Sequence, residues 1–167
     1  MKIRPRGPGD LITCEQMADH VLVTDGYPPR LAPGGLRDFI AAPDSLGAWV
    51  AVDADDMVVG QAVLNPNSSR EVMALAQRVT GLPPGRFGVV ARLVVSPSAR
   101  RTGVATALLN VVTAAARERG LLPLLDVATH FSGAISLYEA CGWRCIGQVS
   151  VAIADQDPLP EYVYLAP

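Results

Sequence analysis

Apolar and polar residues alternate along the chain in two kinds of block. Short apolar runs predict strands over residues 1–5, 47–53, 57–64, 87–95 and 121–128, with closing strands over 143–153 and 161–165. Apolar residues at helical spacing predict helices over 10–25, 34–41, 70–80, about 102–120 and 132–140. Clusters of Pro and Gly separate these blocks and indicate turns. The order of the blocks predicts a mixed α/β fold.

The longest helix has the clearest pattern. Val104, Leu108, Val111 and Ala115 follow one another at steps of four, three and four, which is one buried face, and Gly120 supplies a C-terminal stop. Buried strands precede and follow this helix. A strand, a helix and a second buried strand predict a right-handed parallel crossover over about residues 87–128. We expect the closing strands to be antiparallel.

Composition narrows the class of protein. The 167 residues predict a single domain over 1–167, and half of them are apolar, which excludes a disordered chain. A net charge of −2 and 5% aromatic residues argue against a nucleic-acid binder. The three cysteines show no metal or disulfide spacing, and we find no signal peptide or membrane span. We therefore expect a cytoplasmic protein that holds no metal and binds no membrane.

Residues 92–109 (RLVVSPSARRTGVATALL) carry the most informative chemistry. An apolar strand ends at Ser96, a basic loop follows, and a helix begins near Thr102. The first turn of a helix has unpaired N–H groups and a partial positive charge. Gly103 lets a ligand approach the backbone, and Arg100 and Arg101 add charge. This pattern predicts a pyrophosphate site; the alternative is a plain connection with solvated arginines.

Two motifs resemble those of the GNAT superfamily of N-acetyltransferases. Arg100-x-x-Gly103-x-Ala105 is similar to its acyl-CoA signature, and residues 134–143 (AISLYEACGW) are similar to its Ala-x-x-Leu-Tyr-Glu-x-x-Gly-Phe helix, with Trp143 in place of Phe. The resemblance implies a central twisted mixed sheet of six to seven strands, flanking helices and one parallel strand-helix-strand unit. It also implies direct transfer of an acetyl group from acetyl-CoA to an amine of a small molecule or peptide, without a metal.

The resemblance assigns roles to particular positions. It implies that the coenzyme A pyrophosphate contacts Arg100, Arg101, Thr102, Gly103, Val104, Ala105 and Thr106. It implies that the backbone of Leu93, Val94 and Val95 holds the pantetheine arm. Tyr138 matches the tyrosine that protonates the departing thiolate, although simple packing in the core is the alternative. Phe131 stands where the family usually has an Asn, so a polar contact at the start of that helix is lost.

The general base has no clear match, because the strand at 87–95 contains Arg92 and no carboxylate. The candidates are Glu71, Asp126, His20 and His130, or a chain of water molecules, and we take His130 because it follows a strand at its C-terminal end. Arg92 could contact a carboxylate of the acceptor. We favour instead an ion pair between Arg92 and Asp126.

Acceptor specificity is expected from the less regular segments 19–39, 70–80 and 155–161. The carboxylates of Asp25, Asp155, Asp157 and Glu161 would favour a cationic acceptor, or form a solvated acidic surface. Two other functions stay open: a GNAT-fold protein that binds coenzyme A without catalysis, and a protein-binding module. The sequence is compatible with a monomer or a homodimer.

Overall fold

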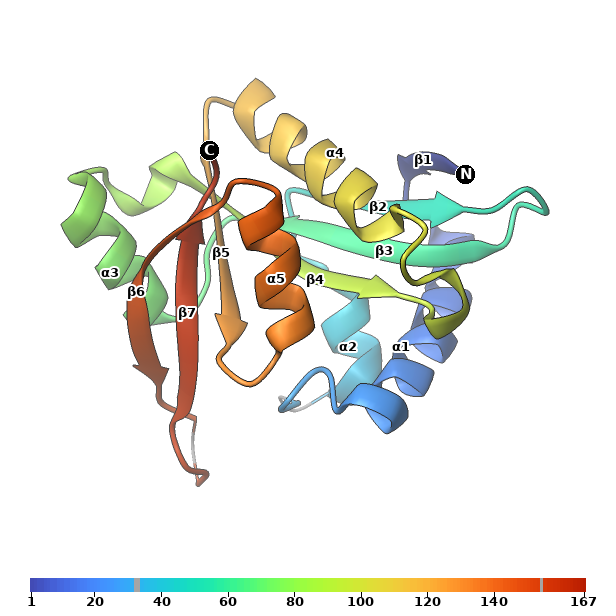
Figure 1. Ribbon diagram of the computed structural model, residues 1–167, viewed down its shortest axis with the longest axis horizontal. Helices are drawn as coiled ribbons and strands as arrows, with labels where there is room; N and C mark the ends of the chain where they lie inside the picture. Colours follow the sequence, from blue (N-terminus) through green and yellow to red (C-terminus); the bar gives the residue numbers. More distant parts are fainter. Residues whose placement is uncertain (32–33, 154) are drawn as a thin grey trace. The chain divides into compact units, whose positions relative to one another are not determined.

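Seven strands form one mixed sheet, in the order β1-β2-β3-β4-β5-β7-β6 (Figure 1). The computed structural model describes residues 1–31, 34–153 and 155–167. The strands are β1 (Lys2–Pro5), β2 (Gly47–Val52), β3 (Val58–Asn65), β4 (Phe87–Val95), β5 (Leu122–Ala128), β6 (Arg144–Val151) and β7 (Leu159–Leu165). The helices are α1 (Leu11–Asp25), α2 (Gly35–Ala41), α3 (Arg70–Thr80), α4 (Val104–Glu118) and α5 (Ser132–Ala140), with short 3-10 turns at Pro8–Asp10, Pro84–Arg86 and Pro97–Ala99. The predicted mixed α/β class is confirmed.

The chain divides into two compact units. Residues Met1–Leu64 and Val90–Ala114 form unit 1, and residues Asn65–Val89 and Ala115–Pro167 form unit 2. Strand β4 and helix α4 each contribute residues to both units.

Unit 1 contains the antiparallel strands β1, β2 and β3 and the helices α1 and α2, which lie against each other (Figure 1). Its core joins apolar residues of α1 and α2 to Val50, Val52 and Val94 of the sheet. Helix α4 lies close to β3, because a Cβ at Gly60 would be 2.9 Å from Val104 Cγ1 and 3.0 Å from Leu108 Cδ1. The lack of a side chain at Gly60 therefore lets the start of α4 approach the strand.

Unit 2 contains the parallel pair that the sequence predicts. Residues Phe87–Val89 of β4 pair with Leu122–Leu124 of β5. Strand β7 pairs antiparallel with both β5 and β6, as expected for the closing strands. Helix α3 packs against β6 and β7, and its apolar face joins the core of the unit.

Three local predictions were wrong. On α4 the buried residue is Val112 instead of Val111, a shift of one position that a helical turn of 3.6 residues allows. On α3 the helical spacing of Val72, Leu75, Ala76 and Val79 predicts one buried face, but Val79 is 46% exposed and Met73 is buried with the other three. The sequence offers Asp10 as the cap of the helix predicted over residues 10–25, but its side chain does not cap α1, because its carboxylate is bound by Arg4 and by the backbone N–H of Gly7. None of the described helices is long and apolar enough to cross a membrane.

Candidate functional site

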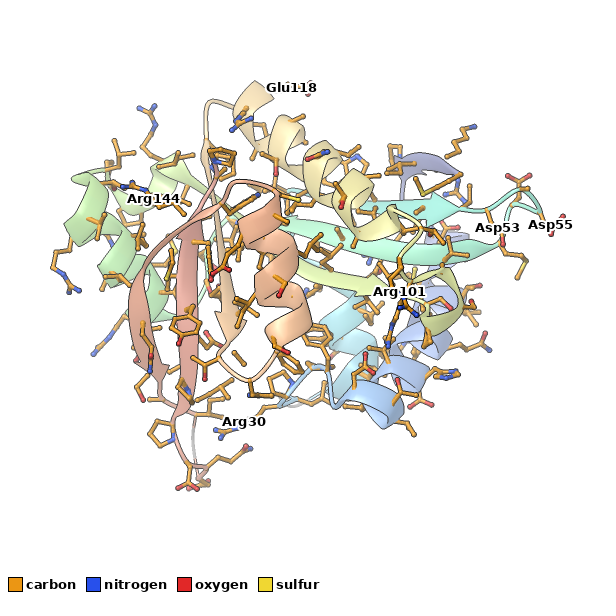
Figure 2. The ribbon with its side chains drawn as sticks, in the orientation of Figure 1. Arg30, Asp53, Asp55, Arg101, Glu118 and Arg144 are labelled. Atoms are coloured by element: carbon orange, nitrogen blue, oxygen red, sulfur yellow. The ribbon has the colours of Figure 1, made fainter. Side chains whose placement is uncertain are left out.

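The loop that leads into α4, residues 96–103, forms one hydrogen bond near each of its ends, and several of its residues are exposed. The N–H of Ser96 donates to the carbonyl of Val59 on β3, and the Thr102 hydroxyl donates to the carbonyl of Ala99 at 2.6 Å. Arg101, Thr102 and Gly103 are exposed, and Figure 2 labels Arg101 in this loop. We call residues 96–103 the entrance loop.

Two residues of the entrance loop have left-handed backbone. Arg101 has φ 58° and Gly103 has φ 87°, with Thr102 between them. Such alternation is the backbone pattern that turns successive N–H groups toward one side in concave anion sites. The first helical bond runs from Ala107 N to Gly103 O at 3.0 Å, so the amides of residues 104–106 have no acceptor within the helix. The loop thus offers several N–H donors at the positive end of the α4 dipole.

Space around Gly103 is also open. A Cβ built on Gly103 meets no atom within 4 Å, so the glycine is required by its positive φ and not by crowding. A ligand can therefore approach the backbone there. A large side chain at this position would occupy the approach.

The two arginines of the loop differ in their partners. Arg100 donates to both carboxylate oxygens of Asp25 at the end of α1, one of them at 3.3 Å. This pairing partly neutralises Arg100 and removes Asp25 from the acidic residues that could receive a cationic acceptor. Arg101 is exposed and is the more available cation of the two.

The end of β4 leads into this loop. Within β4 the pairing with β5 covers Phe87–Val89, and Leu93–Val95 lie beyond that stretch. Val94 is buried at 2% exposure, whereas Leu93 and Val95 are partly exposed. The backbone of Leu93–Val95 therefore has polar groups that the parallel ladder does not use.

In unit 2, Tyr138 is fixed by the way α5 ends. Gly142 has φ 80°, the Gly142 N–H donates to Glu139 O, and the Trp143 N–H donates to Tyr138 O, both at 3.0 Å. These two bonds form a Schellman motif, in which the residues at its two ends make an apolar contact. The rings of Tyr138 and Trp143 are 6.4 Å apart, so Trp143 fulfils the role that the motif gives to Phe.

Tyr138 is 9% exposed and its ring also lies 6.1 Å from that of Tyr164. Burial, reinforced by the negative charge of Asp126, raises the pKa of the Tyr138 phenol. No hydrogen bond to its hydroxyl occurs among the residues that the structure describes. Tyr138 therefore keeps its proton and can donate it.

Beside Tyr138, two carboxyl groups on neighbouring strands lie within hydrogen-bond reach of each other. Ala128 of β5 is opposite Glu161 of β7, which places Asp126 and Glu161 diagonally on one face. Ser68 donates to Asp126 at 2.7 Å, and Asp126 also forms a hydrogen bond with Glu161. Burial, then the charge and hydrogen bond of Asp126 and the charge of Glu71, raise the pKa of Glu161 to about 8. This pair was not predicted, because only the register of β5 and β7 brings it together.

The other polar residues singled out in the sequence have different surroundings. His130 is exposed after β5, with its ring 4.2 Å from that of Phe131, and His20 is exposed on α1. The expected ion pair between Arg92 and Asp126 is wrong. Asp126 has Ser68 and Glu161 as partners, and Arg92 lies over the Phe39 ring of α2.

The predicted site residues fall into two groups. The entrance loop, the start of α4 and Leu93–Val95 belong to unit 1, whereas His130 and Tyr138 belong to unit 2. Asp126, which the sequence already offered as a candidate base, and Glu161, which now joins the candidates, also belong to unit 2. Within the described ranges, no group of three or more His, Cys, Asp or Glu side chains is arranged to hold a metal ion.

Comparison with known proteins gives one family. Residues 16–143 match the model of the acetyltransferase (GNAT) family. No curated protein matches the sequence.

Solved structures of the same fold cover nearly the whole chain. The Arabidopsis thaliana NAA60 complex with acetyl-CoA is 21% identical, with a TM-score of 0.72, over 98% of this chain and 96% of that one. The same NAA60 in complex with a bisubstrate analogue is 21% identical, with a TM-score of 0.70, over 99% and 97%. The ribosomal-protein-alanine N-acetyltransferase of Brucella melitensis is 19% identical, with a TM-score of 0.71, over 99% and 98%.

Proposed function

The chain belongs to the acetyltransferase (GNAT) family, and from this premise we propose that it transfers an acetyl group directly from acetyl-CoA to the amine of a small molecule or peptide. The family makes it an acyltransferase. The donor, the acceptor and the residue roles below are our proposal. The observation that carries it is the exposed entrance loop with left-handed residues on either side of Thr102.

We assign the pyrophosphate of coenzyme A to the entrance loop and the first turn of α4. Backbone N–H groups between Arg101 and Thr106 bind its oxygens, and the dipole of α4 favours the negative charge. Arg101 adds a positive side chain, while Arg100 holds the loop against Asp25. Gly103 supplies the conformation and leaves the space open.

We assign the pantetheine arm to β4. The backbone of Leu93, Val94 and Val95 donates and accepts hydrogen bonds as a neighbouring strand would. Because the pyrophosphate lies after Val95 in the chain, the thioester end of the donor lies toward the earlier residues of β4. Backbone recognition places no demand on the side chains except that they be apolar.

The reaction forms one C–N bond and breaks one C–S bond. The amine nitrogen attacks the thioester carbon, and negative charge develops on oxygen and then on sulfur. The Tyr138 hydroxyl gives its proton to the departing thiolate, so that free thiol leaves. A donor that is already oriented toward the developing charge lowers the barrier.

The amine must also lose a proton. We assign this step to the Asp126–Glu161 pair, because a carboxyl group with a pKa of about 8 accepts a proton from an amine far better than an ordinary carboxylate. His130 remains the second candidate, at the exposed end of β5.

The three free cysteines support our placement of the enzyme in the reducing cytoplasm.

Release of free thiol from acetyl-CoA tests the proposed function. We expect at least one member of a panel of amino acids, peptides, polyamines and amino sugars to raise the rate of thiol release above hydrolysis without amine. Tight binding of acetyl-CoA with no such increase would support the alternative, a GNAT-fold protein that only binds the coenzyme. Absence of any thermal stabilisation by acetyl-CoA would contradict both functions.

A further inference from the structure

Among the residues whose placement is described, unit 1 contains two buried nitrogen atoms that have no hydrogen-bond partner. They are Nη1 of Arg92 and Nε2 of Gln61. A buried donor without an acceptor costs about 1–3 kcal/mol, and more when it is charged. Such atoms are rare in folded proteins and call for an acceptor that arrives from outside.

Arg92 is held in an unusual position on β4. Its φ of 53° is left-handed, although the residues on both sides continue the strand. Its Cζ atom lies 5.0 Å from the centre of the Phe39 ring of α2, a cation–π contact. Phe39 in turn meets the ring of Tyr27 edge to face at 5.9 Å. Arg92 as a residue is partly exposed, so a ligand in solution can approach its guanidinium group, of which Nη1 is the buried nitrogen.

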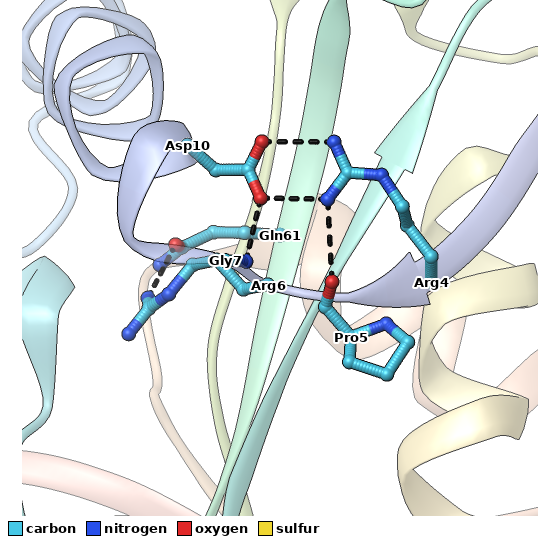
Figure 3. Close-up of polar contacts among 6 residues, drawn as sticks. All are labelled: Arg4, Pro5, Arg6, Gly7, Asp10 and Gln61. Atoms are coloured by element: carbon cyan, nitrogen blue, oxygen red, sulfur yellow. Dashed lines mark hydrogen bonds and ion pairs between the residues drawn. The ribbon is translucent and has the colours of Figure 1, made fainter.

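Gln61 of β3 is fully buried, and its orientation is set by Arg6. Nη1 of Arg6 donates to Gln61 Oε1 at 2.9 Å, as Figure 3 shows. Reversing the amide would place two donors against each other, so Nε2 must point away from Arg6. Arg6 also donates to the carbonyl oxygens of Ile40 and Ala41 at the end of α2.

These contacts place two cations at the end of α2, and the Gln61 amide is bound to one of them. Arg92 touches Phe39, and Arg6 binds Ile40 and Ala41, so both guanidinium groups lie at the last turn of α2. We call Arg6, Gln61 and Arg92 the donor cluster.

In the part of the chain that is described, no ion pair joins the donor cluster to a carboxylate, although the negative charge of Asp10 acts on Arg6 from a greater distance. The ion pairs found there are Arg4–Asp10, Arg37–Glu15 and Arg100–Asp25, and Figure 3 shows the first of them beside Arg6. Burial lowers the pKa of Arg92, the charge of Tyr27 raises it, and the positive charge of Arg6 makes a smaller lowering contribution, so the two cations are close enough to repel. An anion between them would relieve this repulsion and supply the missing acceptors.

We propose that Arg92, supported by Gln61 and Arg6, binds a carboxylate group of the acceptor, so that the enzyme prefers amines that carry a carboxylate near the amino group. The proposal rests on the proposed function, and it names the class of acceptor. Arg92 directly precedes Leu93–Val95 on β4, at the end of the strand segment toward which the thioester would point. A carboxylate on Arg92 therefore leaves the amine of the same small molecule near the donor.

The test compares ligands that differ only in the carboxylate. N-acetyl-leucine and N-acetyl-phenylalanine, which resemble reaction products, are matched with N-isopentylacetamide and N-phenethylacetamide, which lack the carboxylate. Binding is measured by calorimetry with coenzyme A present, so the measurement does not need turnover. We expect the carboxylates to bind about tenfold or more tightly than their partners, as for one charge-assisted hydrogen bond.

Two variants show whether Arg92 is responsible. Arg92→Met keeps an unbranched apolar stem and removes the charged guanidinium group, and it should abolish the difference within each pair. Arg37→Met is the control, because it removes an exposed cation from the same helix region and should preserve the difference. Thermal unfolding of both variants checks folding, and we expect Arg92→Met to be at least as stable as the unaltered protein.

The outcomes separate the two proposals. Equal binding of acids and amides, or a preference that survives Arg92→Met, would overturn the carboxylate site. An amine panel acetylated without regard to the carboxylate would overturn it while the acetyltransferase function stands. Carboxylate binding that depends on Arg92, in a protein that acetylates no amine, would support the site and contradict the catalytic proposal.

Discussion

Tyr138 combines the properties that a proton donor to sulfur needs. Its ring is packed between Trp143 and Tyr164, so its position is fixed by the core of unit 2. Burial and the charge of Asp126 raise the pKa of its hydroxyl, which keeps the group protonated at neutral pH. The same burial supports the simpler role of a packing residue, and the two roles differ in what a hydroxyl deletion does.

Removal of the hydroxyl separates these roles. We expect Tyr138→Phe to lower kcat by about 10²–10⁴-fold, the usual range for a lost general acid, while KM changes little. Steady-state kinetics with an accepted amine measures both constants. Unchanged turnover would show that Tyr138 only packs, and Tyr164→Phe controls for loss of a neighbouring hydroxyl.

The conformation and role of a single residue could be predicted from the sequence where the residue belongs to a local motif. Gly103 and Gly142 have positive φ, as their places at the start and end of helices require. The partners of Asp126 and Arg92 were not predictable, because each depends on residues more than 30 positions away in the chain. We expected Arg92 and Asp126 to form an ion pair, but Asp126 contacts Ser68 and Glu161, and Arg92 contacts Phe39.

At the scale of elements, the ladder between β5 and β7 creates the acidic pair. Asp126 and Glu161 lie on one face because Ala128 is opposite Glu161 in the register. Two carboxylates this close cannot both ionise without cost, so the pair holds one proton to a higher pH than either group would alone.

The pH dependence of the enzyme should reveal this proton. The pKa of Glu161 is about 8 in the folded protein, against 4.5 as the ordinary value, so the folded state binds more protons between these limits. The free energy of unfolding should therefore fall as pH rises from about 4.5 to 8. If the pair is the base, kcat/KM should rise over the upper part of the same range.

The variant Glu161→Gln tests both statements, because its amide can donate to Asp126 without titrating. We expect a flatter dependence of the melting temperature on pH and the loss of the rise in kcat/KM near pH 8. His130→Gln is the matched control and should leave both profiles in place. The reverse result would assign the base to His130.

The element boundaries were largely predictable, since α3, β4 and α5 begin and end where their patterns do. The spacing of apolar residues and the Gly and Pro residues at the ends of elements determine these boundaries, and both are visible in the local sequence. The choice between Val111 and Val112 on α4 was not predictable, because the partner strands decide which of two adjacent apolar residues is buried.

For the whole molecule, the two motifs were enough to predict the family. The entrance loop belongs to unit 1, and the residues assigned to proton transfer belong to unit 2. The parallel pairing of β4 and β5 was predicted from the apolar pattern over about residues 87–128, whereas the order of the strands in the sheet was not predicted. The donor cluster could not be foreseen, because it depends on Arg6, Gln61 and Arg92 meeting at the end of α2.

The most direct test of the central claim is the affinity for acetyl-CoA of two glycine variants, measured by calorimetry. Gly103 and Gly120 lie before and after α4, both have positive φ, and a Cβ on either meets no atom within 4 Å. Gly103→Glu and Gly120→Glu should therefore lose similar stability, about 1 kcal/mol. We expect Gly103→Glu to bind at least about 100-fold more weakly, since its carboxylate repels the pyrophosphate, and Gly120→Glu to bind as the unaltered protein does. Equal affinity of the two variants would contradict the account.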